Sequence, residues 1–181
     1  MRIKDYICGM RKHNGMRPQD IVILLKIVSK RKQIWQNKDL AYELFLSQSE
    51  VSESLNRSMI AGLINSEKEK VHRQSLLEFI RYGVHYVFPV IPGGLSHGVL
   101  TAHSHSLMRA EFASEQNYVW PEVGGKEMGL TVEPLYKDVV KAIKKDENLY
   151  NLLALVDVLR VGRAREINYA LPILKTRILH E

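Results

Sequence analysis

The sequence predicts a mainly α-helical protein in three parts: an N-terminal unit of helices with a short β-hairpin, a long connecting segment, and a C-terminal helical unit. Apolar residues recur at helical spacing in both halves, and helix-start and helix-stop residues flank those stretches. Between them, residues 91–134 hold six of the eleven glycines and three of the six prolines, which indicates loop. A basic arm (1–16) precedes these three parts, which are the N-terminal domain (17–90), the connecting segment (91–134) and the C-terminal region (135–181).

The first expected helix covers about fifteen residues from Pro18. Proline suits the first helical turn, and Asp20 complements the positive N-terminal end of the helix dipole. Apolar residues follow at helical spacing before the basic residues 30–32: Ile21, Leu24, Leu25 and Val28. A short second helix is expected over residues 38–44.

A third helix is expected to begin at Ser47. Ser47 and Glu50 match a capping box, in which the hydroxyl accepts from the amide of Glu50 and the glutamate accepts from the amide of Ser47. Its inward stripe consists of Val51, Leu55 and Met59, and Gly62 supplies a left-handed stop. Beyond it, residues 63–64 and 71–73 are expected to form a small two-stranded wing, followed by a helix over 74–82 and an extended stretch over 84–90.

The second half contains one strongly apolar segment. Residues 147–161 follow the cap residue Asp146 and carry Leu and Val almost all round, so this expected helix must be buried. A helix is also expected over 135–145, and another over 163–179 that Pro172 should kink or split. The segment 91–134 is expected to run over the surface or across a partner subunit.

The net charge of +6 is confined to the first half of the chain. Residues 1–75 hold 14 Lys and Arg against 8 Asp and Glu, whereas residues 76–181 hold 12 of each. A positive excess on one half fits a surface that faces phosphates, and solubility is the alternative explanation.

Several classes of protein are excluded by composition. No apolar run approaches the roughly 18–20 residues that cross a bilayer, and the start has no signal-peptide pattern. Cys8 is the only cysteine, so no internal disulfide and no Cys-based zinc finger is expected. We therefore expect a cytoplasmic protein that makes no contact with membranes.

Residues 37–57 match the spacing that two helices need when they cross at a fixed angle. The pattern requires apolar residues at set positions and one small residue, because a larger side chain would push the helices apart. All of those positions fit: Leu40, Ala41, Leu44, Leu46, Val51 and Leu55. With the helix before it and residues 61–64 after it, the stretch resembles the winged helix-turn-helix of bacterial transcription regulators, including the MarR-like group, over residues 17–73.

Phe45 departs from that pattern. The turn residue is usually a glycine in the left-handed conformation, and a bulky residue there costs about 1 kcal/mol or more. Either the turn is irregular or Phe45 gains by packing.

The resemblance implies that the third helix enters the major groove of double-stranded DNA. The candidate base-reading residues are the outward side chains near its start: Gln48, Ser49, Ser52, Glu53 and Asn56. For Glu53 the alternative is a solvated acid that makes no base contact. The candidate phosphate-binding residues lie on this helix and on flanking segments: Lys38, Ser47, Arg57, Lys68, Lys70 and Arg73.

Two further groups of polar residues are more simply explained without a ligand. His97, His103 and His105 include a His-x-His pair that could bind a transition metal, but no cysteine or closely spaced acid accompanies them, so no metal is expected. The second half also holds a charged cluster, in which salt bridges at a subunit interface are favoured over a site for a phosphate-bearing effector or nucleic acid: Asp157, Arg160, Arg163, Arg165 and Glu166. No catalytic or dinucleotide motif is present, so neither an enzyme nor a cofactor is expected.

The expected function is transcriptional regulation by a DNA-binding repressor that acts as a homodimer. We expect the apolar helix over 147–161 to pair with its twin, the alternative being that residues 135–145 and 163–179 cover it within one subunit. Three other functions remain open: an antitoxin-like autorepressor whose C-terminal half binds a toxin, a replication or partition protein that uses the same DNA-binding motif, and, least favoured because no acidic metal-binding set is visible, an enzyme that acts on nucleic acid.

Overall fold

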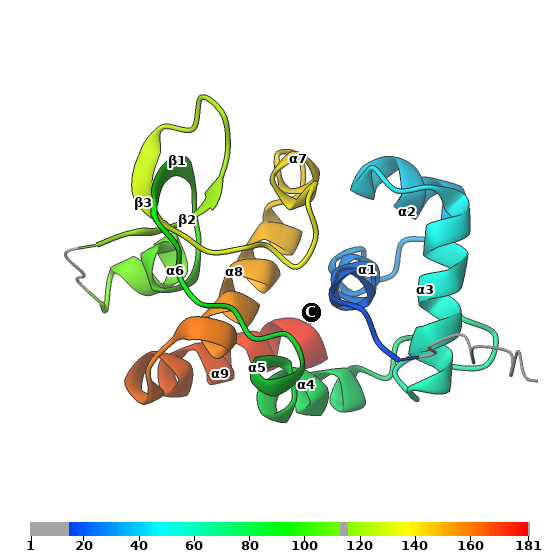
Figure 1. Cartoon of the computed structure of the whole chain (residues 1–181). Coiled ribbons are helices and arrows are strands. Elements are labelled where there is room, and N and C mark those ends of the chain that lie inside the picture. Colours follow the sequence, from blue (N-terminus) through cyan, green and yellow to red (C-terminus); the bar gives the residue numbers. More distant parts are fainter. Residues whose placement is uncertain (1–14, 113–115, 181) are drawn as a thin grey trace, which may run out of the picture.

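The computed structural model of the chain describes residues 15–112 and 116–180. It is mainly helical with one small three-stranded sheet, as expected at that coarse level (Figure 1). The elements in chain order are α1 (Pro18–Ser29), α2 (Asn37–Leu44), α3 (Gln48–Ile60), α4 (Arg73–Tyr82), α5 (Val84–Val87), β1 (Leu95–Leu100), the 3-10 turn η2 (Ala102–Ser104), α6 (Ser106–Arg109), β2 (Tyr118–Pro121), β3 (Glu127–Thr131), α7 (Val139–Ile143), α8 (Glu147–Val161) and α9 (Ala164–Leu179). The expected basic arm lies almost wholly outside the described residues.

Helix α1 lies at the centre of the molecule, with α2 and α3 on one side and α8 on the other (Figure 1). Every residue from Asp20 to Val28 is buried, since seven of the nine are apolar and the two charged ones, Asp20 and Lys26, are paired with opposite charges. The buried ammonium of Lys26 lies 2.6 Å from Glu43 of α2 and 2.6 Å from Asp146, the cap of α8. Burial by itself raises the pKa of Asp146, but hydrogen bonds from Lys26 and the Leu149 amide lower it below its usual range. Lys26 therefore joins the two halves of the chain.

Helix α8 has the bounds that the sequence predicts, with Asp146 accepting from the Leu149 amide at 2.9 Å and Gly162 at its end. Leu149 and all residues from 151 to 160 are buried within this one chain, against α1, α5, α7, α9 and η2. The expectation that α8 pairs with a twin helix is therefore wrong. Apolar side chains all round a helix indicate burial but do not say which chain supplies the cover.

The expectation of a structureless segment over residues 91–134 is also wrong. Strand β1 pairs antiparallel with both β2 and β3, and β2 pairs with β3 in parallel, so that three short strands close into a small barrel. The glycines that indicated loop are what allow this closure. A Cβ on Gly98 would collide with the Trp120 carbonyl, and one on Gly129 would collide with the Asn117 carbonyl.

A buried carboxylate attaches this sheet to α8. Asp157 accepts from the Thr101 hydroxyl at 2.9 Å, the Trp120 indole at 2.6 Å and Arg160 at 2.7 Å. Arg160 also donates to the carbonyls of Phe88 and Glu133, at 3.0 Å each. These two members of the predicted charged cluster are thus internal rather than part of a subunit interface.

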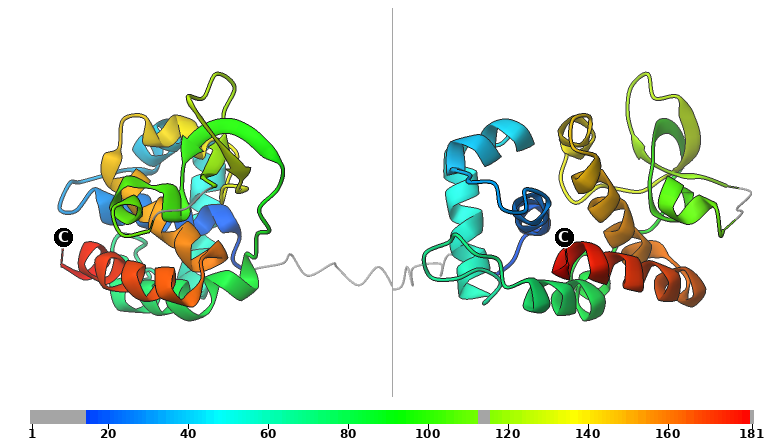
Figure 2. Two further views of the ribbon diagram at one scale, coloured as in Figure 1. Left: turned by 90° about the vertical axis from the view of Figure 1, so that its left-hand side faces the viewer. Right: turned by 180° about the vertical axis from the view of Figure 1, so that it is seen from behind.

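Three local expectations also need correction. Residues 84–87 form the short helix α5 instead of an extended stretch, and α7 is shorter than the expected 135–145. Helix α9 continues through Pro172 without a break, and Figure 2 shows it as one rod alongside α4. Within residues 15–112 and 116–180, no helix combines the length and apolarity that a bilayer span requires.

Candidate nucleic-acid interface

Helices α2 and α3 are joined by a tight turn at residues 45–47. Phe45 adopts the left-handed conformation (φ 55°, ψ 39°), so the turn has the backbone form that usually requires glycine. The Leu46 amide then donates to the Ala41 carbonyl at 2.9 Å. The Phe45 ring is 55% exposed, with the Lys141 ammonium 5.9 Å from its centre. The turn is therefore regular, which excludes the irregular turn, and the exposed ring gains little from packing.

The apolar residues of the pattern hold the α2–α3 pair as the spacing predicts. All are buried except Leu46, which is partly buried: Leu40, Ala41, Leu44, Val51 and Leu55 form the contact. The Tyr136 hydroxyl donates to the Leu44 carbonyl at 2.5 Å, which fixes the end of α2 to the segment before α7. The helix pair is therefore held both by its own apolar residues and by a hydrogen bond from the second half of the chain.

The start of α3 is closed by the predicted capping box. The Glu50 amide donates to the Ser47 hydroxyl at 3.1 Å, and the Ser47 amide donates to the Glu50 carboxylate at 2.9 Å. The hydrogen bond from the Ser47 amide is the main cause that lowers the pKa of Glu50. Glu50 is thus an anion committed to the cap, and the Ser47 hydroxyl is engaged with it at 2.8 Å.

All five candidate base-reading side chains are accessible. Gln48 and Ser49 are exposed, and Ser52, Glu53 and Asn56 are half-buried. They lie away from the buried stripe of α3, which includes Val51 and Leu55. Glu53 lies 3.8 Å from Arg57, so its carboxylate is partly neutralised by its own helix.

Arg57 is not available to phosphates, which corrects the expectation for this residue. Its guanidinium is buried and donates to both carboxylate oxygens of Asp20 on α1, at 2.9 Å and 2.6 Å. The hydrogen bond to Asp20 raises the pKa of Arg57 further above its usual value. Arg57 therefore clamps α3 to α1. The sequence alone predicts an outward Arg57, because the local pattern relates Asp20 only to the helix dipole and not to a residue of α3.

The expected wing is reduced to one antiparallel bridge between Ile64 and Val71. Its turn is ordered by Asn65, whose side-chain oxygen accepts from the amides of Glu69 and Lys70 at 2.8 Å each. Lys70 is exposed and Lys68 is half-buried, with a left-handed φ of 60°. Arg73 is half-buried, and one of its guanidinium nitrogens donates to the Ile178 carbonyl of α9 at 2.9 Å, so part of its hydrogen-bonding capacity is committed to that helix end.

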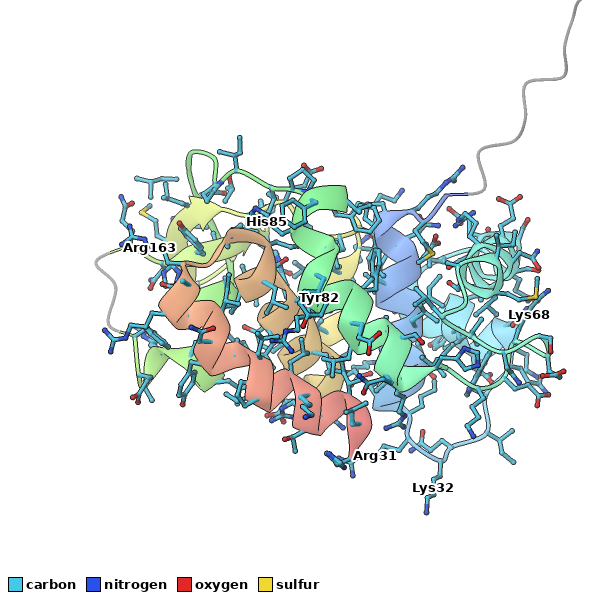
Figure 3. The ribbon with its side chains drawn as sticks, turned by 90° about the horizontal axis from the view of Figure 1, so that it is seen from below. Arg31, Lys32, Lys68, Tyr82, His85 and Arg163 are labelled. Atoms are coloured by element: carbon cyan, nitrogen blue, oxygen red, sulfur yellow. The ribbon has the colours of Figure 1, made fainter. Side chains whose placement is uncertain are left out.

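A groove of about 630 Å³ separates this wing from the loop between α1 and α2. Ser52 and Leu55 of α3 line it. Arg31 and Lys32 lie on the loop rim, and on the wing rim Lys68 lies between two acids, Glu67 and Glu69. Lys32 projects away from the ribbon in Figure 3, and Lys38 is exposed in the first turn of α2. The loop cations Arg31 and Lys32 were missed as site residues because the run 30–32 was taken only as a helix end. Lys30 of that run is held by Glu43 at 2.6 Å.

Two of the three histidines set aside from sequence, His103 and His105, have structural partners. His103 makes a ring-nitrogen hydrogen bond with the Gln116 carbonyl at 3.0 Å, and His105 caps α6 by accepting from the Leu107 amide at 3.3 Å. Across the residues that the structure describes, no three His, Cys, Asp or Glu side chains are grouped so as to hold a metal ion. Comparison with known proteins adds nothing to this geometry, since no family model, no curated protein and no solved structure matches the chain.

Proposed function

We propose that residues 17–73 form a winged helix-turn-helix unit that binds duplex DNA, and that the protein is a sequence-specific transcriptional repressor. The observation that carries this proposal is the start of α3. It presents accessible polar side chains on a helix that is clamped to α1 by Arg57 and to α2 by the buried pattern residues. A rigid helix with a polar, accessible N-terminal face is what major-groove recognition requires.

In this proposal the two kinds of contact come from different side chains. Gln48, Ser49, Ser52 and Asn56 contact base edges, and Glu53 accepts from a cytosine amino group. Phosphates on either side are bound by Lys38, Lys68 and Lys70, with Arg31 and Lys32 from the far rim of the groove. The other three candidates stabilise the fold: Ser47 through the capping box, Arg57 through Asp20 and Arg73 through the Ile178 carbonyl.

The finer elements of the proposal follow from DNA recognition itself. One unit of this size contacts few base pairs, so a homodimer on a two-fold symmetric operator is the arrangement we propose. Such a repressor acts in the cytoplasm and blocks transcription by occupying its operator. It needs no cofactor and performs no catalysis.

The proposal is tested by paired substitutions measured with fluorescence anisotropy on duplex DNA. Lys68→Ala with Lys70→Ala should weaken binding to all sequences and make the dependence of log Kd on log salt shallower by about two units, one for each lost phosphate contact. Lys175→Ala, at an exposed site on α9, is the matched control and should change neither quantity.

Gln48→Ala should narrow the gap between preferred and random DNA by about 1–3 kcal/mol while leaving the salt dependence unchanged. Equal behaviour of the Lys68/Lys70 double variant and the Lys175 variant would overturn the phosphate assignment. Unchanged discrimination in the Gln48 variant would move base recognition away from α3.

A further inference from the structure

Exposed apolar side chains gather in residues 82–95, which connect α4 to β1. This stretch, here named the 82–95 surface, lies at the opposite end of α4 from the wing. Five large apolar side chains there are more than half exposed: Tyr82 at 63%, Tyr86 at 80%, Val87 at 51%, Ile91 at 89% and Leu95 at 63%. Figure 3 shows Tyr82 and His85 well away from Lys68, so the 82–95 surface is separate from the proposed DNA contacts.

The same stretch has no charged residue. Between Arg81 and Arg109 the sequence contains no Lys, Arg, Asp or Glu, although 25% of the whole chain is charged. Exposed surface that is rich in tyrosine and depleted of charge has the composition of the core of a protein–protein interface. An isolated monomer that leaves such a patch in water is prone to aggregation.

The stretch is held firmly to the core. His85 makes a ring-nitrogen hydrogen bond with the Arg160 carbonyl at 2.8 Å, at the end of α8. Phe88 is buried and packs edge-on against Phe79, with 6.3 Å between ring centres. The exposed side chains therefore project from a fixed backbone, which lowers the entropy that is lost when a partner binds.

We propose that two copies of this chain associate through the 82–95 surface. The low charge of the stretch favours a second copy as the occupant. Its neighbouring cation, Arg81, lies over the Tyr82 ring, with 4.8 Å from the guanidinium carbon to the ring centre, so two-fold pairing brings mainly uncharged side chains together. The area is also sufficient. At roughly 200 Å² for a fully exposed tyrosine and somewhat less for an aliphatic side chain, the five side chains expose on the order of 600 Å². A standard interface buries about 800 Å² per partner, of which somewhat more than half is apolar.

This inference rests on the proposed function in one respect: a two-fold symmetric operator needs a dimer, and the 82–95 surface would supply it. The association itself is tested without DNA. The full chain is sedimented at micromolar concentration as wild type, Tyr86→Glu, Ile91→Glu and Tyr42→Glu. Tyr42 on α2 is the matched control, because it is 82% exposed and lies outside the 82–95 surface. Wild type and Tyr42→Glu should sediment as dimers. Tyr86→Glu and Ile91→Glu should each raise the dimer Kd by about a hundredfold or more, since each buries an unpaired carboxylate.

Circular dichroism melting of the same samples separates lost association from lost folding. All three substituted side chains are more than three-quarters exposed, so the melting temperatures of the variants should match the wild type apart from the contribution of the dimer. A wild-type monomer throughout the range, or a dimer that persists in both the Tyr86 and Ile91 variants, would overturn the proposal while leaving DNA binding untouched. A wild-type protein that sediments as a dimer but does not bind duplex DNA would instead count against the proposed function alone.

Discussion

The buried pair between Arg57 and Asp20 gives the sharpest stability prediction. Arg57→Ala removes the guanidinium but leaves the Asp20 carboxylate, which has no exposed surface, on the central helix α1. Among the described residues, the Arg17 amide also donates to that carboxylate, at 2.7 Å, and remains in the variant. Breaking a buried ion pair by removal of one partner costs about 3–5 kcal/mol, because a charge is left without compensation.

The magnitude can be separated into its causes with a double-mutant cycle. Asp20→Asn alone leaves a buried guanidinium opposite a neutral amide and should cost about as much as Arg57→Ala. Arg57→Met combined with Asp20→Asn removes both charges while it keeps the volume of the side chains. That double variant should recover at least half of the loss, since neither charge then remains buried and unpaired.

The assay is urea unfolding followed by far-ultraviolet circular dichroism, in which an unchanged slope shows that the same surface is exposed. Lys175→Ala is the control and should stay within about 0.5 kcal/mol of the wild type. A loss of less than about 1 kcal/mol in Arg57→Ala would refute the reasoning. In that case Arg57 would behave as a surface cation, and it would again be a candidate for a contact with DNA phosphates.

Three other predictions concern separate parts of the fold. Burial, reinforced by the charge of Arg177, lowers the pKa of His105 from 6.5 to about 4. The unfolded chain therefore takes up this proton first, and stability present above pH 6.5 is lost as the pH falls toward 4. The loss should be about 3 kcal/mol, and His105→Asn, which keeps a cap acceptor without titrating, should abolish that part of the pH dependence of urea unfolding. Trp120→Phe removes one donor from the buried Asp157 and should cost about 1–3 kcal/mol, measured by the same method, whereas a neutral result would mean that water replaces the indole. Phe45→Val should lower the melting temperature more than Phe45→Gly, because a β-branched residue is strained at φ 55°; equal melting temperatures would contradict the left-handed turn.

Local signals predicted the helices well. Ser47 with Glu50 and Asp146 with Gly162 mark helix ends through hydrogen bonds that span only a few residues, so the sequence contains all the information needed. Pro172 is the exception. A proline removes one amide donor, and tertiary packing of α9 against α8 and α4 keeps the helix continuous despite that loss.

Long-range partners were beyond the reach of the sequence. Gly98 and Gly129 indicate loop in a local window, yet each permits a close approach between strands that are far apart in the chain. Charge counting has the same weakness. Lys26, Lys30 and Arg57 all contribute to the positive excess of residues 1–75, but each is held by an acid inside the fold. Fewer cations are therefore exposed toward phosphates than the net charge suggests, and one of them, Lys32, lies in a loop whose position only the fold defines.

The central claim, sequence-specific binding of duplex DNA by α3, is tested most directly by selection from a random duplex library. The full wild-type chain is incubated with the library at physiological salt, and bound duplexes are amplified and sequenced over several rounds. The proposal predicts enrichment of a two-fold symmetric sequence that binds at least about a thousandfold more tightly than scrambled DNA. No enriched sequence, or equal Kd values for the enriched and scrambled duplexes at every salt concentration, would contradict it.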